Sequence, residues 1–161
     1  HTTSPCTGRY GLDAPEGADP APGKGRCALV VAVGVRIVDA AGFRERLSRD
    51  FIASVFLPEE AGYADSRARR HESFAARFAA KEAVIDALGD RGIGLNRVEV
   101  FRNDDSGEVG VRLYGEAAER AALMGVDRVS LSMSHAGGAA LALVVLTGSG
   151  TRPVPQPGEK G

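Results

Sequence analysis

A helix built largely of alanine and phenylalanine carries a charged pair in the stripe that should face the core. The stretch "SFAARFAAKEAVIDAL", residues 73–88, places four apolar side chains on one seam at helical spacing: Phe74, Phe78, Ile85 and Leu88. The same seam reaches Lys81 and Glu82, although an isolated buried charge is costly. The pair therefore indicates either a binding site or a structural arrangement. In the latter, Lys81 reaches water along its stem and Glu82 meets a basic neighbour.

A second candidate site lies at the start of "SMSHAGGAALALVVL", where a predicted strand ends in a turn. His135 comes directly after the strand, and the small residues that follow it indicate an exposed turn. Ser132 and Ser134 provide hydroxyl groups, and Gly137 and Gly138 leave the backbone open to a phosphate or carbonyl oxygen. A single histidine is more often structural, so these flanking residues are what favour a binding role.

The turn after the long helix, "GDRGIG", offers backbone that a ligand can approach closely. Its first glycine, Gly89, is explained by capping of the helix. Gly92 and Gly94 have no such explanation, and the lack of a side chain opens the backbone there. Arg77 and Lys81 lie four residues apart on the preceding helix, so they share a face and form a small positive patch.

The composition is that of an ordinary single-domain globular protein. The chain has 161 residues, of which 43% are hydrophobic, and a formal net charge of -1. No general attraction to nucleic acid or to a membrane is therefore expected. Only 6% of the residues are aromatic, which also disfavours stacking on bases. Cys6 and Cys27 make neither a disulfide framework nor a metal-binding pattern, which favours a cytoplasmic protein with incidental thiols.

The pattern along the chain predicts an α+β domain over residues 27–146, with a mainly antiparallel sheet packed against the long helix. The flanking segments 1–26 and 147–161 are rich in glycine and proline and are predicted to be flexible tails or linkers. Asp39 suits the N-cap of a helix. Helices are predicted at 39–53, from 57–60 onward, at 70–88 and at 115–124, and strands at 28–38, 97–103, 108–115, 128–135 and 139–146.

Three stretches together resemble a known protein family. "FAARFAAKEAVIDALGDRGIG" looks like the signature helix and following turn of the holo-acyl-carrier-protein synthases, in the 4'-phosphopantetheinyl transferase superfamily. "LSMSHAGGAALALVVL" resembles their closing motif, and "SGEVGVRLYGEAAERAALMG" is similar to their central hairpin and small helix. The resemblance covers residues 34–146, so it implies the 4'-phosphopantetheinyl transferase-like fold for nearly all of the predicted domain.

The resemblance also implies a reaction and the residues that serve it. Enzymes of this family move 4'-phosphopantetheine from coenzyme A to a serine of an acyl carrier protein, and the coenzyme lies at the interface of a homotrimer. By position, Glu82 would be a magnesium ligand and Lys81 would contact the diphosphate, whose charge must be neutralised. The other residues implied to lie near the coenzyme are Ser134 and His135 at its nucleotide end, and Gly92 and Gly94 near its pantetheine arm.

One position departs from the family's pattern. The first strand of these enzymes ends in a Gly-x-Asp motif whose aspartate is the other magnesium ligand, and the matching position here is Arg36. A hard divalent cation requires oxygen ligands, which a guanidinium cannot supply. Arg36 is therefore predicted either to act at the diphosphate or to form a bidentate pair with Glu82 in the metal position. Asp39, at a second position that is usually acidic, is the remaining candidate ligand for a weak metal site.

Three functions fit this pattern. The first is a working transferase in which Arg36 partly replaces the metal, so that magnesium is doubtful as a cofactor. The second is a repurposed fold that acts on a polyketide-like or carrier-bound substrate, for example as a cyclase. The third is a non-catalytic module that binds coenzyme A or a carrier protein. The resemblance favours the first function, and Arg36 favours the second.

Overall fold

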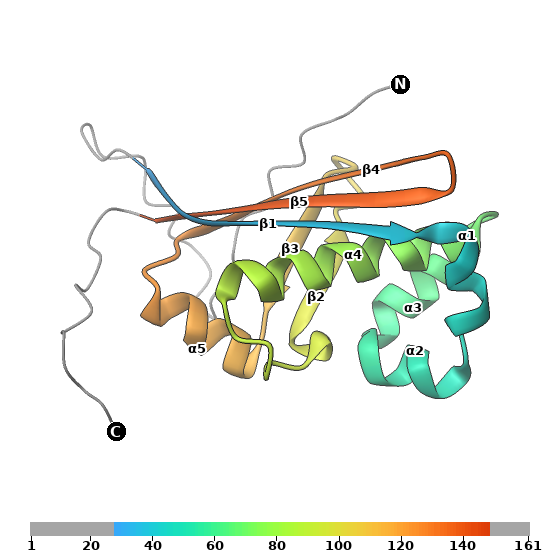
Figure 1. Ribbon diagram of the computed structural model, residues 1–161, viewed down its shortest axis with the longest axis horizontal. Coiled ribbons are helices and arrows are strands. Elements are labelled where there is room, and N and C mark those ends of the chain that lie inside the picture. Colours follow the sequence, from blue (N-terminus) through green and yellow to red (C-terminus); the bar gives the residue numbers. More distant parts are fainter. Residues whose placement is uncertain (1–27, 149–161) are drawn as a thin grey trace.

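In the computed structural model, a three-stranded antiparallel sheet lies against one long helix, accompanied by shorter helices and a two-stranded hairpin (Figure 1). The structure describes residues 28–148. The predicted tail 1–26 lies outside this range, as do both cysteines. The predicted tail 147–161 also lies outside it, apart from two residues that continue the last strand to Gly148.

The helices and strands follow the predicted order. The helices are α1 (Ala40–Phe43), α2 (Arg49–Val55), α3 (Pro58–Asp65), α4 (Arg70–Leu88) and α5 (Gly115–Leu123). The strands are β1 (Leu29–Asp39), β2 (Val98–Arg102), β3 (Val109–Leu113), β4 (Arg128–Ala136) and β5 (Ala139–Gly148). Short 3-10 turns occupy Arg44–Arg46 and Leu95–Arg97. The α+β class is therefore confirmed, and no helix within 28–148 is both long and apolar enough to cross a bilayer.

The segment predicted as a single helix over 39–53 is two helices with a break between them. Asp39 caps α1, because its carboxylate accepts a hydrogen bond from the Gly42 N–H at 3.1 Å. After a 3-10 turn the chain leaves helical geometry at Leu47. Ser48 then begins α2, its hydroxyl accepting from a backbone N–H three residues further on at 3.1 Å. A serine satisfies a free donor at a helix start, so this local hydrogen bond overrides the continuous helical pattern.

The three-stranded sheet places β5 between β1 and β4, antiparallel to both. Figure 1 shows α4 beneath this sheet, with α2 and α3 near one end of α4 and α5 near the other. Since side chains alternate along a strand, the register aligns three rows on the face turned away from α4. These rows are Val33–Val145–Ser130, Val35–Leu143–Ser132 and Ile37–Leu141–Ser134. No described element covers this face, and Ile37 is 69% exposed.

Small side chains allow α4 to lie close to the sheet. Ala79, Ala80 and Ala83 are fully buried against the strands. The approach is closest at Gly34 of β1, where an added Cβ atom would lie 1.9 Å from the carbonyl oxygen of Ala83. A larger set of aromatic side chains joins α1 and α2 to α4: Phe43, Phe51, Phe56, Phe74 and Phe78. The position of α4 is thus fixed by contact with β1 on one side and an aromatic cluster on the other.

Replacing Gly34 by alanine is expected to lower the free energy of unfolding by about 1–3 kcal/mol, because the methyl group collides with the backbone of α4. The control is Gly62→Ala in α3, where an added Cβ meets no atom within 4 Å. Alanine there should raise stability by about 0.5–1 kcal/mol. Urea denaturation followed by circular dichroism measures both, and unchanged stability of Gly34→Ala would contradict the close approach.

Candidate active site

Lys81, expected at a phosphate, is instead sealed in the core. Its side chain is 0% exposed, and its ammonium group donates to three backbone carbonyl oxygens. These belong to Val55 at 3.0 Å, Leu95 at 3.3 Å and Val98 at 2.5 Å. A carboxylate oxygen of Glu60 lies 2.7 Å away. The diphosphate contact predicted for Lys81 is therefore wrong, and so is the alternative in which it reaches water, because every donor is already engaged inside the fold.

Glu60, on α3, is the buried partner that the sequence analysis did not find. It is 2% exposed and accepts hydrogen bonds from the backbone N–H groups of Leu57 and Val100, both at 2.8 Å. Burial lowers the pKa of Lys81, and the charge of Glu60 opposes that effect. The only signal in the sequence was a second glutamate in "LPEE", which reads as an ordinary first turn of a helix. Lys81 thus lies in the apolar seam of α4 for a structural reason, namely its buried ion pair with Glu60.

Glu82 lies at a cavity of about 240 Å³ between β1, α4 and the turn that follows α4. The charged residues that line it are Arg36, Glu82, Asp86 and Arg91. Arg36 donates from Nε to Asp86 Oδ2 at 2.5 Å, and an Arg91 nitrogen lies 3.4 Å from the other oxygen of Asp86. The predicted bidentate pair between Arg36 and Glu82 is therefore wrong, because the carboxylate that Arg36 contacts is that of Asp86. The hydrogen bond that Arg36 donates to Asp86, with the charges of Asp86 and Glu82, raises the pKa of Arg36 above its usual value.

A second cavity, of about 500 Å³, is strongly basic. Its basic lining residues are Arg67, Arg69, Arg77, Arg102 and His135, and Glu72 is its acidic one. Arg77 is only 5% exposed, donates to Ser73 Oγ at 2.9 Å and stacks over the ring of Tyr63 at 4.3 Å. Its buried Nε has no hydrogen-bond partner among the described residues, and burial lowers the pKa of Arg77. An anion in this cavity would offset the cost of burying that guanidinium.

The remaining predicted contacts divide between separate surfaces. His135 lines the basic cavity, whereas Ser134 lies in the row with Ile37 and Leu141 on the opposite face of the sheet. The resemblance implies both beside the nucleotide end of the coenzyme; within one chain they lie on opposite faces of the sheet, since consecutive strand residues face opposite ways. Gly92 and Gly94 are exposed in the turn whose Arg91, Ile93 and Leu95 line the smaller cavity.

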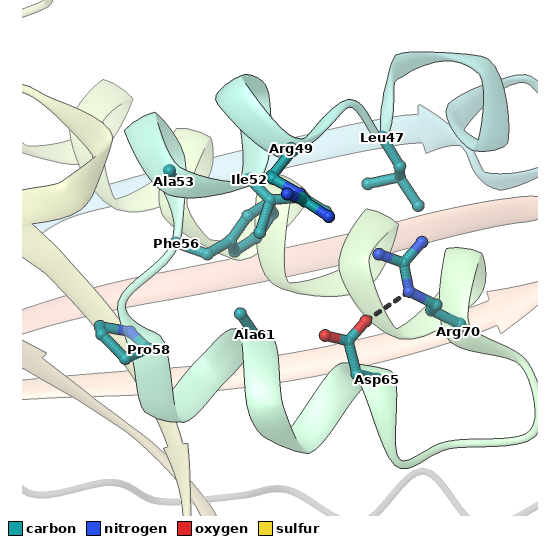
Figure 2. A pocket seen from close by; sticks show the side chains of 9 residues that line it. All are labelled: Leu47, Arg49, Ile52, Ala53, Phe56, Pro58, Ala61, Asp65 and Arg70. Atoms are coloured by element: carbon teal, nitrogen blue, oxygen red, sulfur yellow. Dashed lines mark hydrogen bonds and ion pairs between the residues drawn. The ribbon is translucent and has the colours of Figure 1, made fainter.

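A third and larger cavity, of about 610 Å³, was not predicted from the sequence. Figure 2 shows side chains of α2 on one side of it and those of α3 on the other, with Arg70 and Asp65 paired at one end. Six of its lining residues are apolar: Leu47, Ile52, Ala53, Phe56, Pro58 and Ala61. Arg49 adds a second positive charge. Its walls suit an apolar chain rather than a nucleotide.

Comparison with known proteins agrees with this fold. Residues 32–144 match the family model described as ACPS, the 4'-phosphopantetheinyl transferase superfamily. A holo-[acyl-carrier-protein] synthase of Anaeromyxobacter dehalogenans is 38% identical over 128 residues, covering 76% of this chain and 99% of the relative. One from Clavibacter michiganensis is 42% identical over 123 residues, covering 74% and 98%. This chain belongs to the holo-acyl-carrier-protein synthase family.

Solved structures of synthases show the same architecture. The Plasmodium yoelii holo-ACP synthase has a TM-score of 0.67 at 25% identity, covering 77% of this chain and 99% of that one. The Chronobacterium ammoniagenes synthase, solved as a complex with coenzyme A, has a TM-score of 0.61 at 33% identity, covering 74% and 96%. The family and fold expected from the three sequence stretches are therefore confirmed.

The smaller cavity does not fit the magnesium ion that the synthase family implies. Its carboxylates are Glu82 and Asp86, and Asp86 is already paired with Arg36 and Arg91. Asp39 does not line this cavity, because its carboxylate caps α1. Within the described part of the chain, no group of three or more His, Cys, Asp or Glu side chains could hold a metal ion. Two guanidinium groups also repel a divalent cation, and Asp39 does not rescue the site.

Lys81→Met is expected to lower the free energy of unfolding by about 3–5 kcal/mol, because it leaves the Glu60 carboxylate buried without a cation. The double variant Lys81→Met/Glu60→Gln should recover part of that loss. Arg69→Met is the control, since the guanidinium that Arg69 places 3.5 Å from Glu72 is exposed and its loss should change stability by less than about 1 kcal/mol. Thermal and urea unfolding measure all three. A single variant as stable as the wild type would show that the pair does not stabilise the fold.

Proposed function

We propose that this synthase transfers 4'-phosphopantetheine from coenzyme A to a serine of an acyl carrier protein. The serine oxygen attacks the phosphorus next to pantetheine, and 3',5'-ADP leaves. The observation that carries the proposal is the basic cavity around the buried Arg77, since the 3'-phosphate of coenzyme A requires such a lining. The named activity of the relatives and the coenzyme A complex of the Chronobacterium synthase support it. We also propose a cytoplasmic location, where coenzyme A is available.

We propose that the active unit is a homotrimer. The face of the sheet turned away from α4 exposes Val33, Val35 and Ile37 of β1 beside Leu141 and Leu143 of β5. A contiguous apolar patch of this kind favours a protein interface over contact with water. The two charged cavities support the same arrangement, because Arg36 lies on β1 and His135 on β4, the outer strands of the sheet. A neighbouring copy would bring one cavity of each kind together.

One observation favours a second function. The apolar cavity between α2 and α3 has room for a hydrocarbon or polyketide-like chain, with Arg49 available to an acidic group. A repurposed synthase acting on a carrier-bound chain would use this cavity, and it would not need the metal site that Arg36 disfavours.

Incubation of the full chain with coenzyme A and an apo-acyl carrier protein is expected to add one phosphopantetheine to the carrier, measured by intact-protein mass spectrometry. Arg102→Gln should weaken coenzyme A binding about 10–100-fold in calorimetry, as expected for loss of a charged hydrogen bond worth about 1.5–3 kcal/mol. Arg128→Gln, an exposed arginine outside all of the cavities described above, should bind as the wild type does. Binding without transfer would instead indicate a non-catalytic module, and neither binding nor transfer would indicate a repurposed enzyme.

Val35→Glu is expected to dissociate the trimer, because it places a charge in the middle of the apolar face opposite Leu143. Light scattering coupled to size exclusion should show three times the chain mass for the wild type and a single chain mass for the variant. Leu123→Glu on α5 is the control, since Leu123 is 70% exposed but lies away from this face. A monomeric wild type would disprove the proposed assembly.

A further inference from the structure

The guanidinium of Arg36 uses its Nε in a hydrogen bond but leaves its two terminal amino groups without one among the described residues. Its Nε donates to Asp86 across the gap between β1 and α4, and its side chain is half-buried. Within residues 28–148, the two terminal amino groups of Arg36 make no hydrogen bond. A guanidinium offers two parallel donors in a fixed plane, which matches two oxygens of a phosphate. Asp86 therefore orients Arg36 without using the part of the group that binds phosphate best.

The surroundings of Arg36 can accept such a group. The cavity of about 240 Å³ equals several water molecules at about 30 Å³ each, so a phosphate fits inside it. Gly92 and Gly94 are exposed in the turn beside this lining. Arg91 contributes a second positive charge at the mouth, because it is largely exposed. The negative charge of Asp86 is shared between Arg36 and Arg91, and Glu82 is the other carboxylate of the lining.

We propose that Arg36, oriented by Asp86, binds the diphosphate of coenzyme A directly, so that this synthase needs no divalent cation at that position. The inference rests on the proposed transfer reaction and names what replaces the metal in it. The permanent charge of arginine substitutes for part of the charge of the ion. Asp86 acts as a positioning residue. Arg36, at the position where the family has a metal-ligating aspartate, and Asp86 then act together to bind the diphosphate.

The cation-excluding half of this proposal can be tested without coenzyme A. Titration of the full chain with Mn²⁺, followed by electron paramagnetic resonance, should show no specific binding to the wild type. Arg36→Asp adds a carboxylate beside Glu82 and Asp86 and removes the competing charge, so this variant should bind Mn²⁺. Binding to the wild type that disappears in Glu82→Gln would overturn the proposal. Failure of Arg36→Asp to bind would also count against it, provided circular dichroism shows that the variant is folded.

The phosphate-binding half is tested by calorimetry with coenzyme A in EDTA and in excess Mg²⁺. Wild-type affinity should agree within about twofold between the two conditions, and Arg36→Gln should lose about 10–100-fold in both. Arg128→Gln serves as the control. A wild type that binds coenzyme A only with Mg²⁺, or an Arg36→Gln variant that binds normally, would overturn the proposal.

Absence of coenzyme A binding under every condition would refute the proposed transferase and the phosphate role together. The Mn²⁺ titration would still decide separately whether Arg36 excludes a cation.

Discussion

The buried contact between Lys81 and Glu60 determines where the chemically useful side chains of this synthase can lie. One ammonium group ties together the end of α2, the start of β2, the turn before β2 and a carboxylate on α3. Breaking any of these contacts would leave a charge or a carbonyl group unsatisfied in the core. The rotation of α4 about its axis is thereby fixed, because Lys81 must point into this junction.

That rotation determines the direction of the neighbouring residues on α4. Glu82 is the next residue along, and Asp86 follows four residues later on the same face. Both reach the cavity beside β1, where Arg36 meets Asp86. Arg77, one turn before Lys81, reaches the basic cavity instead. A structural lysine thus separates an arginine–carboxylate site from an arginine-rich site along one helix, and Gly34 keeps that helix near enough to β1 for the pair to form.

Periodicity predicted the elements well, because the long helix and the paired strands carry strong local patterns. It failed at residues 47–48, where the chain leaves helical geometry at Leu47 and the Ser48 hydroxyl caps the start of a new helix. It offered no partner for Lys81, because Glu60 is 21 residues away in the sequence. Charge alone could not show whether Arg36 pairs with Glu82 or with Asp86, one turn further along α4. Position in the family motif gave Lys81 a phosphate role, but motif matching does not show which side of a helix is buried. Strand alternation alone places Ser134 and His135 on opposite faces of the sheet.

The proposed assembly would account for both the two separate charged cavities and the uncovered sheet face. A single chain presents a small cavity with Arg36 on β1 and a larger basic cavity with His135 on β4, separated by the width of β5. Coenzyme A carries its diphosphate and its 3'-phosphate at different places on one molecule, so it needs both kinds of lining in reach at once. The apolar rows led by Val33, Val35 and Ile37 lie between these cavities on the exposed face. Burying those rows against another copy would remove apolar surface from water and would bring β1 of one chain toward β4 of the next, completing a site that neither chain holds alone.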